Sequence, residues 1–133
     1  GTDEVSKGIR SFRETHNPKH MRFIKYLPPE QFIGLLKKAA CLVGNSSSGI
    51  KECSYLGVPV VNIGTRQNGR MRAENVVDVG YEKAAIKRAI KRQITHGLYE
   101  QSAMYHKKGT SKKIAQILAK VTLYSQKRFV DSV

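Results

Sequence analysis

Residues 41–69, CLVGNSSSGIKECSYLGVPVVNIGTRQNG, contain two short apolar runs separated by a segment with helical spacing. The first run is 41–43 and the second is 58–63, and apolar residues recur every three positions from Ile50 between them. A strand, a helix and a second strand in this order build a parallel sheet. The segment therefore predicts an α/β fold, a doubly wound parallel sheet with helices on both faces.

Small polar residues fill the turn between the first predicted strand and the helix. Asn45, Ser46, Ser47 and Ser48 precede Gly49. The opening of a helix offers unpaired backbone N–H groups and a partial positive charge, hydroxyls add donors, and glycine lets the backbone approach a ligand closely. This serine turn predicts an anion site.

Glu52 lies one helical turn further on, and its position has two interpretations. A carboxylate beside a phosphate site can accept hydrogen bonds from neutral hydroxyls, as the acidic residue of dinucleotide folds does with ribose. Alternatively, the turn is an ordinary N-cap with Gly49 as the cap, and Glu52 at N3 folds back onto the cap N–H. The first interpretation indicates a nucleotide diphosphate, and the second indicates no ligand.

The second predicted strand ends at Gly64 and leads into a loop that carries Arg66 and Arg70. In a parallel sheet this loop lies at the same carboxyl edge as the serine turn, where ligands of open α/β sheets bind. Guanidinium groups bind phosphates well. The loop favours a ligand over plain capping.

The strings GNSSSGIKE and LGVPVVNIGTRQNGRMRAENV, in this order, resemble the UDP-N-acetylglucosamine 2-epimerases, and within them the hydrolysing branch used in sialic-acid-type sugar synthesis. The resemblance extends upstream through RFIKYLPPEQFIGLLKKAACLV and covers residues 21–78. The non-hydrolysing branch carries a different loop after the second strand, which favours the hydrolysing branch.

The resemblance implies which residues bind the nucleotide. Ser46 and Ser47 would hold the diphosphate with Gly49 in the same turn, Glu52 would bind the ribose hydroxyls, and Arg66 would reach the ligand from the second loop.

For the base, the resemblance implies backbone hydrogen bonds from Leu27 to uracil, with Phe32 nearby. Ser48 departs from relatives that carry cysteine at this position. Arg70, Glu74 and Asn75 are further candidates.

The family's fold is a glycosyltransferase-B arrangement of two α/β halves, and residues 1–133 suffice for one nucleotide-binding domain, the C-terminal half. The resemblance implies that the carboxylates of catalysis belong to the N-terminal half. We therefore expect this chain to bind UDP or a UDP-N-acetylhexosamine, to need that N-terminal half as a partner for activity, and to contain no catalytic residue. The reaction of the whole enzyme would convert UDP-N-acetylglucosamine and water to UDP and N-acetylmannosamine, without a metal or another cofactor. A half-domain with an exposed cleft can also self-associate, so a homo-oligomer is a further expectation.

The formal net charge of +14 raises a different possibility, a basic nucleic-acid-binding α/β domain. Half of the 24 lysines and arginines lie in residues 83–133. No nucleic-acid motif accompanies them, and a solvated helix face has the same composition, so we do not expect nucleic acid as a partner. Affinity that follows salt and ignores Ser47→Ala would distinguish this alternative.

No segment is apolar enough to span a membrane and the start shows no signal-peptide pattern, so we expect no membrane partner and a cytoplasmic location. Cys41 and Cys53 lack CxxC spacing and the histidines form no ligand pattern, so no metal site is expected.

The remaining pattern predicts further elements. One C-terminal helix has Ile86, Ile90 and Ile94 on its apolar face, and the other begins at an N-cap, Ser111. The other expected elements are a helix at 3–16, a strand at 22–26, a helix at 29–40 and a strand at 76–79.

Overall fold

The computed structural model describes residues 2–122 of the 133-residue chain. The chain divides into two compact units, residues 1–32 and residues 33–133. The predicted organisation as one nucleotide-binding domain over residues 1–133 stays a prediction.

The first unit contains helix α1, Thr2–His16, as predicted. The strand expected at 22–26 is wrong, because this segment is a loop whose side chains face solvent. A strand needs a hydrogen-bonded neighbour, and no described strand pairs with it. Helix α2, Pro29–Lys38, begins at a proline, which suits the first helical position because proline has no N–H to satisfy.

The second unit is built on a three-stranded parallel sheet in the order β1-β2-β3. Strand β1 is Leu42–Gly44, β2 is Val60–Ile63 and β3 is Val76–Val79. Leu42 pairs with Val60, which pairs with Val76. The predicted α/β class with a parallel sheet is confirmed.

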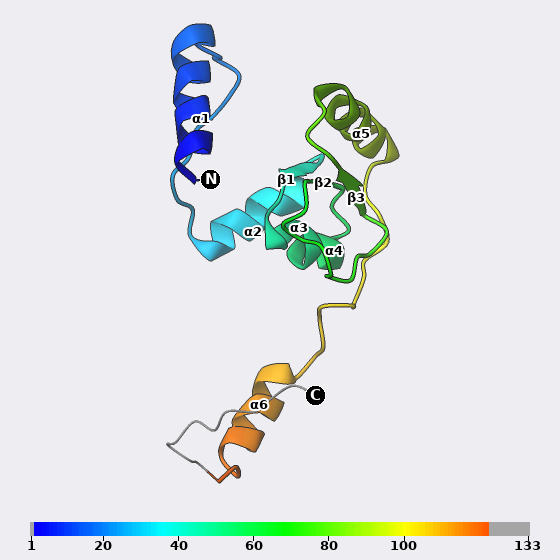
Figure 1. Ribbon diagram of the computed structural model, residues 1–133. Coiled ribbons are helices and arrows are strands. Elements are labelled where there is room, and N and C mark those ends of the chain that lie inside the picture. The colour runs from blue at the N-terminus through cyan, green and yellow to red at the C-terminus, as the bar shows by residue number, and fades with distance from the viewer. Residues whose placement is uncertain (1, 123–133) are drawn as a thin grey trace, which may run out of the picture. The chain divides into compact units, whose positions relative to one another are not determined.

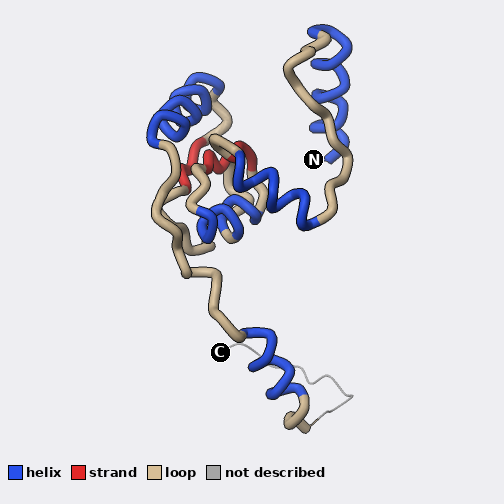
Figure 2. Tube along the Cα trace, turned by 180° about the vertical axis from the view of Figure 1, so that it is seen from behind, coloured by secondary structure: helices blue, strands red, loops and turns tan. Residues whose placement is uncertain are grey.

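Helices cover both faces of this sheet. Helices α3, Ser47–Ile50, and α4, Glu52–Leu56, connect β1 to β2, and α5, Lys83–His96, follows β3. The ribbon shows α3 and α4 on one side of the strands and α5 on the other (Figure 1), and the view from behind agrees (Figure 2). The further assignment to one half of a glycosyltransferase-B fold stays a prediction.

The apolar core lies around the central strand. Val60 and Val61 point to opposite faces of the sheet and are almost fully buried. Ile50 and Cys53, from the two short helices, and Val58, before β2, are fully buried as well. A strand buried on both faces explains why GVPVVNIG reads as a continuous apolar run.

Polar side chains complete the core. Gln93 of α5 is fully buried, and its Nε2 donates to the carbonyl oxygens of Val60 and Asn75, each at 2.8 Å. Its Oε1 accepts from the hydroxyl of Tyr99 at 2.6 Å. One amide therefore joins α5 to the start of β2, to the residue before β3 and to the segment after the helix.

Helix α6, Thr110–Leu118, has Gly109 as its N-cap and no capping side chain. The prediction of Ser111 as the N-cap is therefore wrong by two residues, because the left-handed Gly109 already ends the preceding turn. Within residues 2–122 no helix combines the length and the apolar character needed to cross a membrane.

Candidate functional site

The serine turn follows β1 directly, at the carboxyl end of the strand. Ser46 is the N-cap of α3, and its Oγ accepts a hydrogen bond from the Ser48 N–H at 3.3 Å. The Gly49 N–H donates to the Ser46 carbonyl at 3.1 Å. The cap is therefore Ser46 and not Gly49, so the alternative in which Glu52 folds back onto a Gly49 cap is wrong. Because its oxygen acts as the acceptor, the Ser46 hydroxyl keeps its proton to donate elsewhere.

Gly49 serves packing in this turn. It is buried, and a Cβ at this position would lie 2.9 Å from Cγ1 of Val60. A larger residue would therefore push the turn away from β2. The glycine brings the serine turn close to the central strand, and its predicted place beside a diphosphate stays a prediction.

The loop after β2 lies beside the serine turn. Gln67 Nε2 donates to the carbonyl oxygen of Asn45 at 2.7 Å, and Arg66 Nη1 lies 3.4 Å from Asn45 Oδ1. Arg66 is exposed while Gln67 is buried. The structure thus brings Ser46, Ser47 and Arg66 to one edge of the sheet. Asn45, in the serine turn, is the residue that both side chains of the second loop contact.

Arg72 fixes the second loop and was not singled out from the sequence. Its Nη2 donates to the carbonyl oxygen of Gln67 at 3.0 Å, and its Nε forms an ion pair with Oδ2 of Asp78. Asn62 Nδ2 donates to the other oxygen of Asp78 at 2.6 Å. One sequence feature could have indicated this contact. Asn62 is a polar residue inside an apolar run, and a buried amide needs a hydrogen-bond partner.

Glu52 begins α4, after a break at Lys51 that separates it from α3. Its Oε2 is buried and has no hydrogen-bond partner among residues 2–122. The side chain lines a cavity of about 530 Å³ with Tyr55 and His106, whose rings lie 4.4 Å apart. No residue of the serine turn lines this cavity. Glu52 thus lies beside an open space, and its Oε2 is a buried acceptor without a donor among the described residues.

The remaining predicted residues fall into two groups. Leu27 and Phe32 are half-buried and belong to the first unit, so their contact with a base stays a prediction. Asn75 is a structural residue: it accepts from Ser54 Oγ at 3.0 Å and donates to the Val58 carbonyl at 2.8 Å. With its carboxamide used in the core, Asn75 is not a ligand-binding candidate.

Arg70 and Glu74 are exposed, and nothing in their surroundings assigns them to the site.

The two thiols are poor nucleophiles. Burial, with a smaller contribution from the charge of Glu52, raises the pKa of Cys53 to about 12. Burial also raises the pKa of Cys41. Both thiols are protonated at neutral pH, so thiolate chemistry is not available to the site. Residues 2–122 contain no group of three or more His, Cys, Asp or Glu that could hold a metal ion.

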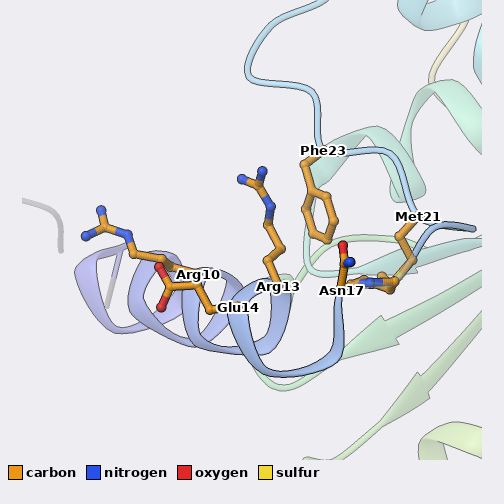
Figure 3. Close-up of a pocket in the computed structure, with 7 residues that line it drawn as sticks. Arg10, Arg13, Glu14, Asn17, Met21 and Phe23 are labelled. Carbon is orange, nitrogen blue, oxygen red and sulfur yellow. The ribbon is translucent and has the colours of Figure 1, made fainter.

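A second hollow, of about 500 Å³, lies inside the first unit (Figure 3). Here the Arg13 guanidinium carbon sits 4.7 Å from the centre of the Phe23 ring. Asn17 ends α1 in a left-handed conformation, which turns the chain back along the helix. None of the residues predicted to bind a ligand lines this hollow, and the cation–π contact is one interaction that joins the loop to the helix there.

The serine turn and the arginine loop lie together at the carboxyl edge of a parallel sheet, which is the edge where open α/β sheets bind their ligands. The sequence profile of the UDP-N-acetylglucosamine 2-epimerase family matches residues 2–119. The chain belongs to this family, and the resemblance inferred from the sequence is confirmed.

Individual relatives agree with this assignment. The chain is 37% identical, over 80% of its length, to the UDP-N,N'-diacetylbacillosamine 2-epimerase (hydrolyzing) of Legionella pneumophila. It is 33% identical, over 77% of its length, to the UDP-N-acetylglucosamine 2-epimerase of Neisseria meningitidis. It is 37% identical, over 68% of its length, to the polysialic acid biosynthesis protein P7 of Escherichia coli. The chain spans only 28%, 29% and 22% of these three proteins, respectively.

Proposed function

We propose that this chain is the UDP-binding segment of a hydrolysing UDP-sugar 2-epimerase. The whole enzyme would convert UDP-N-acetylglucosamine, or a related UDP-sugar, and water to UDP and the free 2-epimer. Family membership and relatives named as hydrolysing epimerases support this. The chain spans less than a third of those relatives, so we propose that it binds UDP and needs the rest of the family fold, the N-terminal half, for turnover.

The pair of contacts to Asn45 carries the proposal for the diphosphate. Because Gln67 and Arg66 both reach Asn45, the arginine loop stands next to the serine turn. An exposed guanidinium and the hydroxyls of Ser46 and Ser47 then approach a common anion from two sides. A nucleoside diphosphate has the charge and the acceptor oxygens that these donors need.

The buried oxygen of Glu52 supports the proposal for the ribose. Oε2 has no donor among the described residues, and leaving a buried carboxylate oxygen without one is costly. A ribose diol supplies two O–H donors and no charge. The cavity that Glu52 lines provides the space for it.

These roles fit the chemistry of the family's hydrolysing reaction. The sugar C2 loses its proton and the bond from C1 to the diphosphate oxygen breaks, giving a glycal and UDP, after which water adds across the new double bond. Negative charge develops on the departing diphosphate. Donors already held in place for that charge lower the barrier, and in this chain Ser46, Ser47 and Arg66 supply them. The groups that move the C2 proton would come from outside residues 1–133.

Calorimetric titration of the chain with UDP tests the proposal. We expect saturable binding that Ser47→Ala or Glu52→Gln weakens by about 10-fold or more, since each removes a charge-assisted hydrogen bond. Ser111→Ala and Glu100→Gln, at exposed positions, are the matched controls and should leave binding unchanged.

Two outcomes would contradict it. If folded Ser47→Ala and Glu52→Gln variants bound UDP as the wild type does, the site would lie elsewhere. If the chain instead bound oligonucleotides with a steep salt dependence that ignored Ser47→Ala, the basic nucleic-acid alternative would replace it.

A further inference from the structure

The loop after β2 is exposed to solvent except at one residue. Of residues 65–70, Gln67 alone is buried, with an exposed fraction of 3%, while Arg66 beside it is exposed. The Nε2 of Gln67 donates to the carbonyl oxygen of Asn45, in the serine turn, at 2.7 Å. A buried amide therefore anchors the neighbour of the arginine that we propose for the diphosphate.

Arg72 holds the same loop through its backbone. Its Nη2 donates to the carbonyl oxygen of Gln67 at 3.0 Å, and its Nη1 donates to that of Arg70. Its Nε forms the ion pair with Asp78. Asp78 lies opposite Asn62 in the register of β2 and β3, and Asn62 Nδ2 donates to it at 2.6 Å. A chain of polar contacts thus runs from the central strand to the loop and on to the serine turn.

Arg66 itself does not fix the loop. Its Nη1 lies 3.4 Å from Asn45 Oδ1, which is long for a hydrogen bond and leaves the guanidinium able to exchange this contact for an anion. The position of the loop therefore depends on Gln67 and Arg72. A binding group that is already in place loses less conformational entropy when its ligand arrives.

The amide of Gln67 carries a cost that packing does not explain. Its Oε1 is buried and has no hydrogen-bond partner among residues 2–122. An apolar side chain of the same size would fill this position without leaving an acceptor unpaired. What the amide adds is the Nε2 hydrogen bond to the serine turn.

We propose that Gln67 and Arg72 are positioning residues for the diphosphate: they hold Arg66 beside the serine turn before the ligand binds, and they do not contact the ligand themselves. The proposal rests on the proposed function, because it takes Arg66 and the serine turn as the diphosphate site. It adds two residues that control the affinity for UDP without touching it.

Calorimetric titration of single variants with UDP tests the positioning. Arg72→Lys keeps the charge but loses the fork that reaches two carbonyls and Asp78, and Gln67→Met removes the Nε2 donor at similar side-chain length. We expect each to weaken UDP binding about 10-fold, because Arg66 must then be ordered on binding. Arg92→Lys and Gln116→Met, at exposed positions, are the matched controls and should leave binding unchanged. Circular dichroism establishes that each variant is folded, and Arg72→Lys decides the question if Gln67→Met does not fold.

A second background separates positioning from a general loss of structure. If Arg72 acts through Arg66, Arg72→Lys should weaken UDP binding less than about 2-fold in an Arg66→Ala background, because the group that it positions is already gone. An equal loss in both backgrounds would mean that Arg72 only supports the fold, and it would overturn the proposal.

The positioning and the UDP site fail separately. If Ser47→Ala weakens UDP binding while folded Gln67→Met and Arg72→Lys variants bind as the wild type does, the diphosphate site stands and the positioning is wrong. If the wild-type chain binds no UDP, both proposals are wrong.

Discussion

At the scale of single residues, a buried glutamine, Gln93, binds α5 to the sheet, whereas the apolar pattern of the helix is made of isoleucines. The sequence predicted a helix with Ile86, Ile90 and Ile94 on its apolar face. In the structure Ala89 and Gln93 are buried, and Ile94 is half exposed. Ile86 and Ile90 are half-buried on the same side of the helix as Gln93, whose amide donates to two backbone carbonyls, those of Val60 and Asn75. Hydropathy cannot reveal such a role, since it depends on the position of those carbonyls.

Replacing Gln93 should therefore cost more than its polar character suggests. Gln93→Leu would bury the carbonyls of Val60 and Asn75 and the hydroxyl of Tyr99 without this partner, and we expect a loss of about 3 kcal/mol in the free energy of unfolding. Thr95→Leu, at an exposed position of the same helix, should change it by less than about 0.5 kcal/mol. Urea denaturation followed by circular dichroism measures both. Equal, small losses for the two variants would mean that the amide bonds are worth little.

At the scale of elements, the order of strands and helices from residue 41 to residue 96 was predictable, because alternating apolar and helical periods leave few other folds. The strand at 22–26 was not, since the same apolar run becomes a strand only when a neighbour pairs with it. The serine turn and the arginine loop were predictable as neighbours from the edge rule for parallel sheets. The contacts that fix them, through Asn45 and Arg72, depend on side-chain geometry that spacing does not encode.

The end of α4 depends on a single glycine. Gly57 has φ +69° and donates to the carbonyls that close the helix. A Cβ there would also meet the backbone oxygen of Tyr99, in the segment after α5.

We expect Gly57→Ala to lower the free energy of unfolding by about 3 kcal/mol, combining left-handed strain with a backbone clash. Gly69→Ala is the matched control, because Gly69 has φ +78° and nothing within 4 Å of the added carbon. It should lose only about 1 kcal/mol, the strain alone. Thermal unfolding of both variants separates the two contributions. Identical shifts in melting temperature would show that the segment after α5 moves aside at little energetic cost.

At the scale of the whole molecule, we expect the chain to bind UDP without catalysing turnover. The chain should release no UDP from UDP-N-acetylglucosamine above the buffer rate, even at concentrations where UDP itself binds, because we propose that the groups that take the C2 proton belong to the N-terminal half. The Neisseria relative serves as the positive control in the same assay, with UDP release followed by chromatography. Turnover by the chain alone would refute the view that the active site needs a second half.

The three-stranded sheet leaves β1 and β3 each with one side unpaired among residues 2–122, while β2 is enclosed between them. Since the residues buried on both faces belong to β2, new strands can join at either margin without repacking the centre. A longer relative can thus add strands at the edges of this sheet. The same segment can be lengthened over evolution while its innermost strand, and the two loops that this strand sets side by side, keep their places.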